Sequence, residues 1–291
     1  MRIAHLITVH KNPAQVERLL IALAHDEADC YVHVDKNVDV RAFAHLARMP
    51  RVYFTRTRVA VRWASYRFTE AILACTREIL ATGHDYDFIN LLSGQDYPIK
   101  PVKTIHAFLA RHLTYSFLSF EREGSPWWGH ARSRVEQYHT TYYQFRGQYR
   151  LQSLLNQFLP ERRFPLPYTL YGGPNSSWWT MSRACATYLV EFMDGHPELR
   201  RFSRFTWGSD EFLPATVLLN SPLRDRIINN NFRYIDWSAG GAHPKVLTQD
   251  DMPRLEQSGQ LFARKFDTAE DAEIIDALDQ LLLHPTNSQA A

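Results

Sequence analysis

Polar side chains that can bind or react follow three short apolar runs in the first third of the chain. The runs and the residues after them are Ile3–Val9 with His10, Cys30–Val34 with Asp35, and Phe88–Leu92 with Ser93–Asp96. If the runs are parallel strands, their carboxyl ends lie at one edge of the sheet, where α/β proteins bind their ligands. We therefore expect one crevice there, in which Asp35 accepts hydrogen bonds from ribose hydroxyls or from the N–H of a base.

These residues also have structural explanations. Asp35 is suited to cap the turn into residues 38–40. His10 fits a turn or the core as readily as a place beside Val9 against a base. The chain contains neither the GxGxxG dinucleotide pattern nor the GxxxxGK[ST] phosphate loop. Any phosphate in this crevice must therefore be held in another way.

Strand and helix patterns alternate through the first 120 residues, which predicts an α/β fold with a mainly parallel sheet and helices on both faces. Further strands are expected at Val52–Phe54, Tyr115–Phe120 and Phe232–Asp236. Glu121–Pro174 is rich in Arg, Tyr, Gln and Pro and predicts a long excursion containing a helix at Tyr149–Phe158. We expect a single domain over residues 1–284, divided into halves at 1–120 and 121–284, and a flexible tail over 285–291.

Two segments carry the capping-box pattern of a helix start. Asn12-Pro13-Ala14-Gln15 precedes an apolar helical face, and Asp267-Thr268-Ala269-Glu270 precedes the last helical pattern of the chain. Each pattern predicts that the first side chain caps the helix that follows.

The composition excludes several classes of protein. The chain has 291 residues, is 45% hydrophobic and 22% charged, and is long enough to bury a large core, so disorder is excluded. Its 33 Lys and Arg against 31 Asp and Glu argue against a nucleic-acid partner. The three cysteines are far apart, which indicates buried thiols in a reducing compartment and no cysteine zinc site. No apolar run of membrane-spanning length or signal peptide is seen, so we expect a cytoplasmic protein with at most peripheral membrane contact.

Five segments in order carry a family resemblance. They are Tyr31–Asn37, Phe88–Lys100, Ser177–Thr180, Ser209–Glu211 and Leu261–Asp267. Together they resemble the core-2/I-branching family of β-1,6-N-acetylglucosaminyltransferases, which also contains peptide O-xylosyltransferases. The resemblance spans nearly the whole chain. It implies a GT-A-type fold, a UDP-sugar donor, an inverting transfer and no divalent metal.

The acidic residues are consistent with that implied lack of metal. Asp85-Tyr86-Asp87 has the Asp-x-Asp spacing of a metal site but precedes the fourth strand, at the wrong end for the crevice. Asp96 lies at the correct end, where we expect it to contact the nucleotide, yet it has no second oxygen ligand two residues away. Two phosphates must then be neutralised by Lys or Arg.

The resemblance assigns that task to Lys265. Arg264 and Lys265 are adjacent, so in an extended segment they point to opposite sides. Lys265 is then expected to face the diphosphate, and Arg264 is expected to face outward. A second cation is expected earlier in the chain, and Lys245 is the nearest match. A solvated surface position is the alternative for both lysines.

The resemblance also implies that Glu211 is the general base that takes the proton from the acceptor hydroxyl. Glu211 and Asp210 follow Ser209 at a predicted helix start, where the helix dipole favours the ionised carboxylate. The alternative is that both acids merely stabilise the helix start. Asp210 is then an orienting neighbour or a cap.

The acceptor side rests on weaker matches. Trp237 occupies a family position whose aromatic ring stacks on the acceptor sugar. Glu121 and Arg134 lie in the excursion where the family binds the acceptor, and Trp178 and Trp179 are expected to border the donor sugar.

The sequence thus predicts a glycosyltransferase that moves N-acetylglucosamine or xylose from a UDP-sugar to a hydroxyl of a glycan or other acceptor, in polysaccharide biosynthesis. A catalytically inactive carbohydrate-binding protein of the same fold is the alternative. A nucleotidyltransferase is disfavoured because it requires two acidic metal ligands in the crevice. The sequence leaves open the donor sugar, the acceptor and the oligomeric state.

Overall fold

The computed structural model describes residues 1–283, and within them a seven-stranded sheet forms the centre of the fold. In sheet order the strands are β10 (Ile227–Asn229), β6 (Ser116–Leu118), β9 (Trp179–Ser182), β4 (Phe88–Ser93), β1 (Ile3–Val9), β2 (Ala28–Val34) and β3 (Val52–Phe54). β9 runs antiparallel to β4 and β6, and the other pairs are parallel. The predicted α/β class with a mainly parallel sheet is confirmed.

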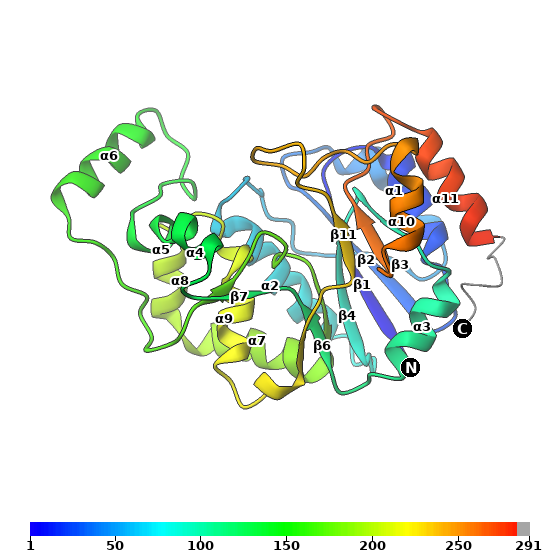
Figure 1. The fold of residues 1–291 in the computed structure, drawn as a ribbon, viewed down its shortest axis with the longest axis horizontal. Coiled ribbons are helices and arrows are strands. Elements are labelled where there is room, and N and C mark those ends of the chain that lie inside the picture. The colour runs from blue at the N-terminus through cyan, green and yellow to red at the C-terminus, as the bar shows by residue number, and fades with distance from the viewer. Residues whose placement is uncertain (284–291) are drawn as a thin grey trace.

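Helices cover both faces of this sheet (Figure 1). One face packs against α1 (Pro13–Ala22), α3 (Val102–Ala110), α10 (Met252–Gln257), α11 (Glu273–Leu283) and the 3₁₀ helix η1 (Val40–Arg48). The other face packs against α2 (Tyr66–Leu80), α7 (Arg183–Gly195) and α9 (Leu213–Leu219). Since β1, β2 and β4 are fully buried, they carry apolar residues on both faces, which is why they read as continuous apolar runs.

The excursion after β6 contains short elements. They are β7 (Glu121–Arg122), α4 (Pro126–Ala131), α5 (Ser133–Glu136), α6 (Gln148–Phe158), β8 (Tyr171–Gly172) and, after α7, α8 (Pro197–Ser203). β7 and β8 pair as a two-stranded sheet. The predicted helix at Tyr149–Phe158 is confirmed as α6, which projects from the body of the molecule (Figure 1).

A second sheet of three strands, in the order β11 (Arg233–Ile235), β12 (Phe262–Arg264) and β5 (Asp96–Pro98), lies at the end of β4. β5 begins three residues after β4 ends, and β12 pairs antiparallel with it so that Arg264 lies opposite Asp96. This sheet therefore brings the last third of the chain to the carboxyl end of β4.

The two predicted capping boxes do not form. Asn12 leaves the start of α1 uncapped and donates from Nδ2 to Asp267 Oδ1 at 2.6 Å, while Lys11 also pairs with Asp267. Gln15 Oε1 accepts from the Thr268 backbone at 2.9 Å. The polar residues of both patterns bind each other across the fold, and α11 begins only at Glu273.

The two predicted halves share one sheet, because β9 and β10 come from the second half and pair with β4 and β6 of the first. The predicted tail at 285–291, and residue 284 itself, lie outside the described residues. Within residues 1–283, no helix is both long and apolar enough to cross a bilayer.

Candidate active site

One cavity of about 520 Å³ opens at the carboxyl ends of β1, β2 and β4, where the sequence predicts a ligand crevice. It brings together residues that were predicted separately for the nucleotide, the reaction and the acceptor. Those on its wall are Val9, His10, Asp35, Trp178, Asp210, Glu211, Trp237 and Lys265. Residues from the two halves of the chain thus form a single site.

Asp35 caps the turn after β2, as one of its two predicted roles requires, and it also lies on the cavity wall. Its backbone N–H donates to the Val9 carbonyl at 2.9 Å, which joins the ends of β1 and β2. Its Oδ1 accepts from the Asn37 backbone at 2.8 Å and from the Val61 backbone at 3.3 Å. The side chain therefore fixes the turn after β2 while lining the cavity.

Close backbone packing holds Glu211 in place. The residue ends the 3₁₀ turn η2 (Ser209–Glu211), and the Gly173 N–H donates to its carbonyl at 3.0 Å. A Cβ atom at Gly172 would lie 2.6 Å from the Glu211 carbonyl oxygen, so only glycine permits this approach. Gly208 precedes the turn with a φ of 61°, in the left-handed region that favours glycine.

The Glu211 side chain is partly buried, with 21% of it exposed, and charged groups surround its carboxylate. Burial and the neighbouring Asp210 carboxylate raise the pKa of Glu211 to about 7, and its ion pair with Arg134 opposes the shift. Arg134 in turn lies over the Trp207 ring, 4.2 Å from its centroid. Glu211 lies in η2, before α9 begins at Leu213, and not in the first turn of an α-helix as predicted. Its pKa is raised, so burial and Asp210 outweigh the helix dipole that was expected to favour the ionised form.

Asp210 faces the same cavity. Its Oδ2 accepts a hydrogen bond from the Ser177 hydroxyl at 2.6 Å, and burial raises its pKa. Two neighbouring carboxyls in a buried site favour proton retention on one of them, so Asp210 contributes directly to the raised pKa of Glu211.

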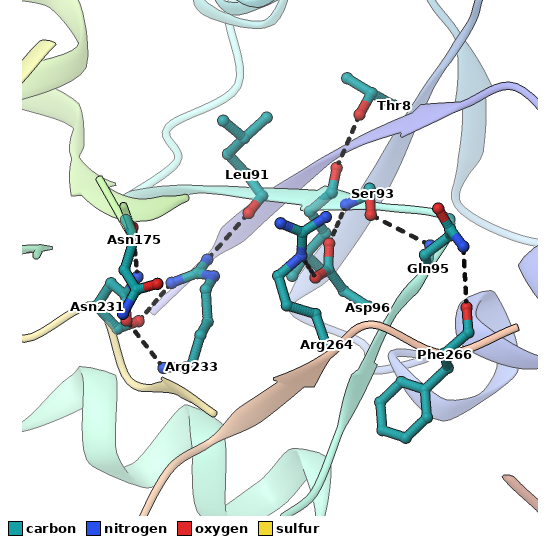
Figure 2. Close-up of polar contacts among 12 residues, drawn as sticks. Thr8, Leu91, Ser93, Gln95, Asp96, Asn175, Asn231, Arg233, Arg264 and Phe266 are labelled. Atoms are coloured by element: carbon teal, nitrogen blue, oxygen red, sulfur yellow. Dashed lines mark hydrogen bonds and ion pairs between the residues drawn. The ribbon is translucent and has the colours of Figure 1, made fainter. Parts of the chain in front are cut away.

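Asp96 is not on the cavity wall. Figure 2 shows its contacts with Ser93 and Arg264. Its side chain is 1% exposed, and Oδ2 accepts from the Ser93 backbone N–H. Arg264 forms an ion pair with Oδ1 at 2.9 Å and covers the Trp178 ring at 4.1 Å. The one acid at the carboxyl end of β4 is therefore occupied by an arginine.

Arg233 forms a second buried layer next to this pair (Figure 2). It donates to Asn90 Oδ1 at 2.6 Å, to the Leu91 carbonyl at 3.0 Å and to the Trp179 carbonyl at 2.9 Å. Burial lowers the pKa of Arg233 to about 9, while the charge of Asp96 opposes that shift. Arg233 thus connects β11 to β4 and β9 through hydrogen bonds.

Arg264 and Lys265 both line the cavity, so the expectation that Arg264 faces outward is wrong. Side-chain alternation holds only within a strand, and β12 ends at Arg264. Burial, Lys11 and Arg264 all lower the pKa of Lys265. Three cations thus lie near one another at this wall, an arrangement suited to a diphosphate.

Other predicted residues lie away from the cavity wall. Lys245 Nζ donates to both carboxylate oxygens of the buried Asp251 at 2.8 Å. Trp179 is fully buried in β9. Glu121 is in β7, where its carbonyl accepts from Trp128 Nε1. Arg134 reaches the site through its ion pair with Glu211.

Several wall residues were not predicted. Arg62, Trp63 and Trp207 lie on the cavity wall, and the Trp63 and Trp207 rings meet edge to face with centroids 5.1 Å apart. Tryptophan next to Arg, Gly or Ser was the available signal, but the loop before α2 matched no regular pattern.

The predicted Trp237 is held in place by its Nε1, which donates to Asn175 Oδ1 at 2.8 Å.

A larger cavity of about 840 Å³ lies on the other side of Arg62, between the loop before α2 and the end of α7. Its acids, Glu70 and Asp194, are already engaged, Glu70 by the Tyr142 hydroxyl and Asp194 by Arg77. The smaller cavity lies at the carboxyl ends of β1, β2 and β4, where such sheets bind ligands, and contains Glu211, so it is the candidate active site.

The α/β fold thus has a crevice at the strand ends that is typical of enzymes. It contains Glu211, whose pKa is about 7, and a cationic wall suited to an anionic ligand. The family model "Branch: Core-2/I-Branching enzyme" matches residues 3–256. The chain therefore belongs to the Core-2/I-Branching enzyme family, a family of glycosyltransferases, as its motifs predicted. The Leu261–Asp267 segment lies beyond the matched range.

Curated relatives agree with this assignment. The chain is 29% identical to xylosyltransferase 2 of Rattus norvegicus and 28% identical to xylosyltransferase 1 of Homo sapiens, over 96% and 97% of its length. It spans about a third of the length of these relatives, 33% and 30% respectively. Among solved structures, mouse xyloside xylosyltransferase 1 aligns over 90% of this chain and 97% of its own with 11% identity and a TM-score of 0.41.

The buried ion pair gives a stability prediction. Asp96→Asn leaves Arg264 and Arg233 as buried cations without their carboxylate, so we expect a loss of about 3–5 kcal/mol of unfolding free energy. Arg264→Met together with Asp96→Asn is expected to cost less than the sum of the single changes. Guanidinium unfolding of the four proteins measures this coupling.

Arg77→Met is the matched control, because its pair with Asp194 is about half exposed and is expected to contribute at most about 1 kcal/mol. A loss below about 1 kcal/mol for Asp96→Asn, or additive single changes, would contradict a structural role of the pair.

Proposed function

We propose that this chain is an inverting glycosyltransferase that moves N-acetylglucosamine or xylose from a UDP-sugar to a hydroxyl group of a glycan or other acceptor, without a divalent metal. The observation that carries the proposal is a partly buried Glu211, with a pKa of about 7, in the same cavity as Lys265 and Arg264. Family membership and the xylosyltransferase relatives support it.

In this proposal Glu211 acts as general base. Its carboxylate takes the proton from the acceptor hydroxyl while that oxygen attacks C1 of the donor sugar. The bond from C1 to the phosphate oxygen breaks, UDP leaves with the electron pair, and attack from the opposite face inverts C1. Arg134 is a positioning residue, because its ion pair with Glu211 orients the carboxylate toward the cavity.

The cations at the end of β12 take the part that a metal plays in other enzymes. Lys265, with Lys11 and Arg264 nearby, is placed to neutralise the charge on the leaving UDP. Asp96 is engaged by Arg264 and the Ser93 N–H and is not offered to a metal ion. Asp35, His10 and Val9 are assigned to the nucleoside, and Trp178 and Trp237 to the sugars.

The alternative is a carbohydrate-binding protein that has lost catalysis. It predicts sugar binding without UDP binding, whereas a transferase binds UDP and hydrolyses or transfers at least one UDP-sugar. Screening hydrolysis of a panel of UDP-sugars tests the proposal and selects between N-acetylglucosamine and xylose. Absence of both UDP binding and turnover across the panel would overturn it.

Glu211→Gln separates catalysis from binding. The amide keeps the volume of the side chain but cannot accept the proton, so we expect turnover of the best donor to fall by about 10²–10⁴-fold. UDP affinity is expected to stay within about twofold, because the base touches the acceptor hydroxyl and not the nucleotide. Turnover within a few-fold of wild type would remove Glu211 from the mechanism, and Asp210 would be tested next.

The raised pKa predicts a pH dependence of the rate. Only the deprotonated carboxylate is a base, so kcat/KM should fall tenfold per pH unit below about 7 and level off above it. Arg134→Met removes the cation that opposes the shift and should move this limb to higher pH. Arg132→Met, an exposed arginine paired with Glu136, is the control that should leave the limb in place. A profile without a limb near neutral pH would contradict this role.

A further inference from the structure

The helix α6 carries apolar side chains that are exposed to solvent. None of the helix residues is buried, and the side chains of Leu154 and Phe158 are 51% and 73% exposed. Leu151, Leu154 and Phe158 follow one another at intervals of three and four residues, so they share one side of the helix. Phe145 and Leu159, which flank the helix in the sequence, are also exposed.

The opposite side of α6 attaches the helix to the protein. Gln152 Oε1 accepts from the Thr140 backbone at 2.9 Å, and Asn156 Oδ1 accepts from the Tyr138 backbone at 2.7 Å. These polar contacts direct the apolar side away from the body, and Figure 1 shows α6 projecting at the end of the molecule far from α11. These contacts thus set the orientation of α6, which is not a frayed end of the fold.

The charge around this face is positive. Residues 137–160 contain no Asp or Glu, although the chain has 31 of them. Arg146 and Arg150 are exposed in this segment, and Arg163 is exposed just after it, with Glu161 as the one exposed acid between them. A protruding helix with a Leu and Phe face and flanking arginines has the character of an interfacial membrane helix.

We propose that α6 docks this protein on the surface of an anionic lipid bilayer, with Leu151, Leu154 and Phe158 inserted below the headgroups. The arginines then lie at the level of the anionic headgroups. A second copy of the chain fits this face less well, because two such helices would bring like charges together. The inference is independent of the proposed reaction, since it concerns a surface outside both cavities.

Vesicle co-sedimentation tests the proposal with the full chain. Wild type is expected to bind mixed phosphatidylcholine and phosphatidylglycerol vesicles, to bind phosphatidylcholine vesicles far more weakly, and to lose affinity as salt is added. Leu154→Gln with Phe158→Gln should weaken binding by at least about tenfold. Arg146→Gln and Arg150→Gln should each weaken it by about fivefold.

Ile21→Gln is the matched control, because Ile21 is an isolated apolar residue on α1 with 62% exposure, and its change should leave binding unaltered. All these side chains are exposed, so circular dichroism should show folded proteins. Wild type that binds no vesicles, or a doubly changed helix that binds as well as Ile21→Gln, would overturn the proposal. So would a lipid-free dimer that Leu154→Gln with Phe158→Gln dissociates, since the occupant would then be a second copy.

Discussion

The buried ion pair between Asp96 and Arg264 is the interaction on which the rest of the site depends. It joins β5 to β12 within the small sheet, and Asp96 also accepts a hydrogen bond from the Ser93 backbone N–H at the end of β4. A carboxylate with 1% exposure would be strongly disfavoured without this partner. Because the pair fixes the end of β12, it also fixes the following residue, Lys265, at the cavity wall. The same contact therefore holds the fold together and determines which charges face the ligand.

The cavity has two parts with different electrostatic environments, one at the end of β12 and one at η2. At the end of β12, Lys11, Arg264 and Lys265 gather on the wall and favour an anionic ligand. At η2, burial and the Asp210 carboxylate raise the pKa of Glu211 to about 7, which suits a base that must both accept and release a proton. Gly172 and Gly208 make that placement possible, since one allows close backbone contact and the other a left-handed turn. The chemistry proposed for this protein follows from these two environments.

Much of the fold could be predicted from local patterns, because the buried parallel strands and amphipathic helices carry their own periodicity. The crevice could be predicted too, because strand ends in such sheets share one edge. The predictions that were wrong concern residues whose partners are distant in the chain. Asn12 and Gln15 bind the segment around Asp267 instead of capping α1. Lys245 is held by Asp251, and Arg264 turns inward to Asp96. The raised pKa of Glu211 arises from burial, which no spacing of residues reveals.

Because Arg264 occupies Asp96, we propose that lysine and arginine side chains, not a divalent cation, hold the diphosphate. The most direct test is the affinity for UDP, measured by calorimetry in excess EDTA and again with saturating Mn²⁺. We expect the same dissociation constant in both conditions and a roughly tenfold to hundredfold weakening in Lys265→Ala under either. UDP binding that EDTA abolishes and Mn²⁺ restores would contradict it, because a metal would then be performing the task assigned to these cations.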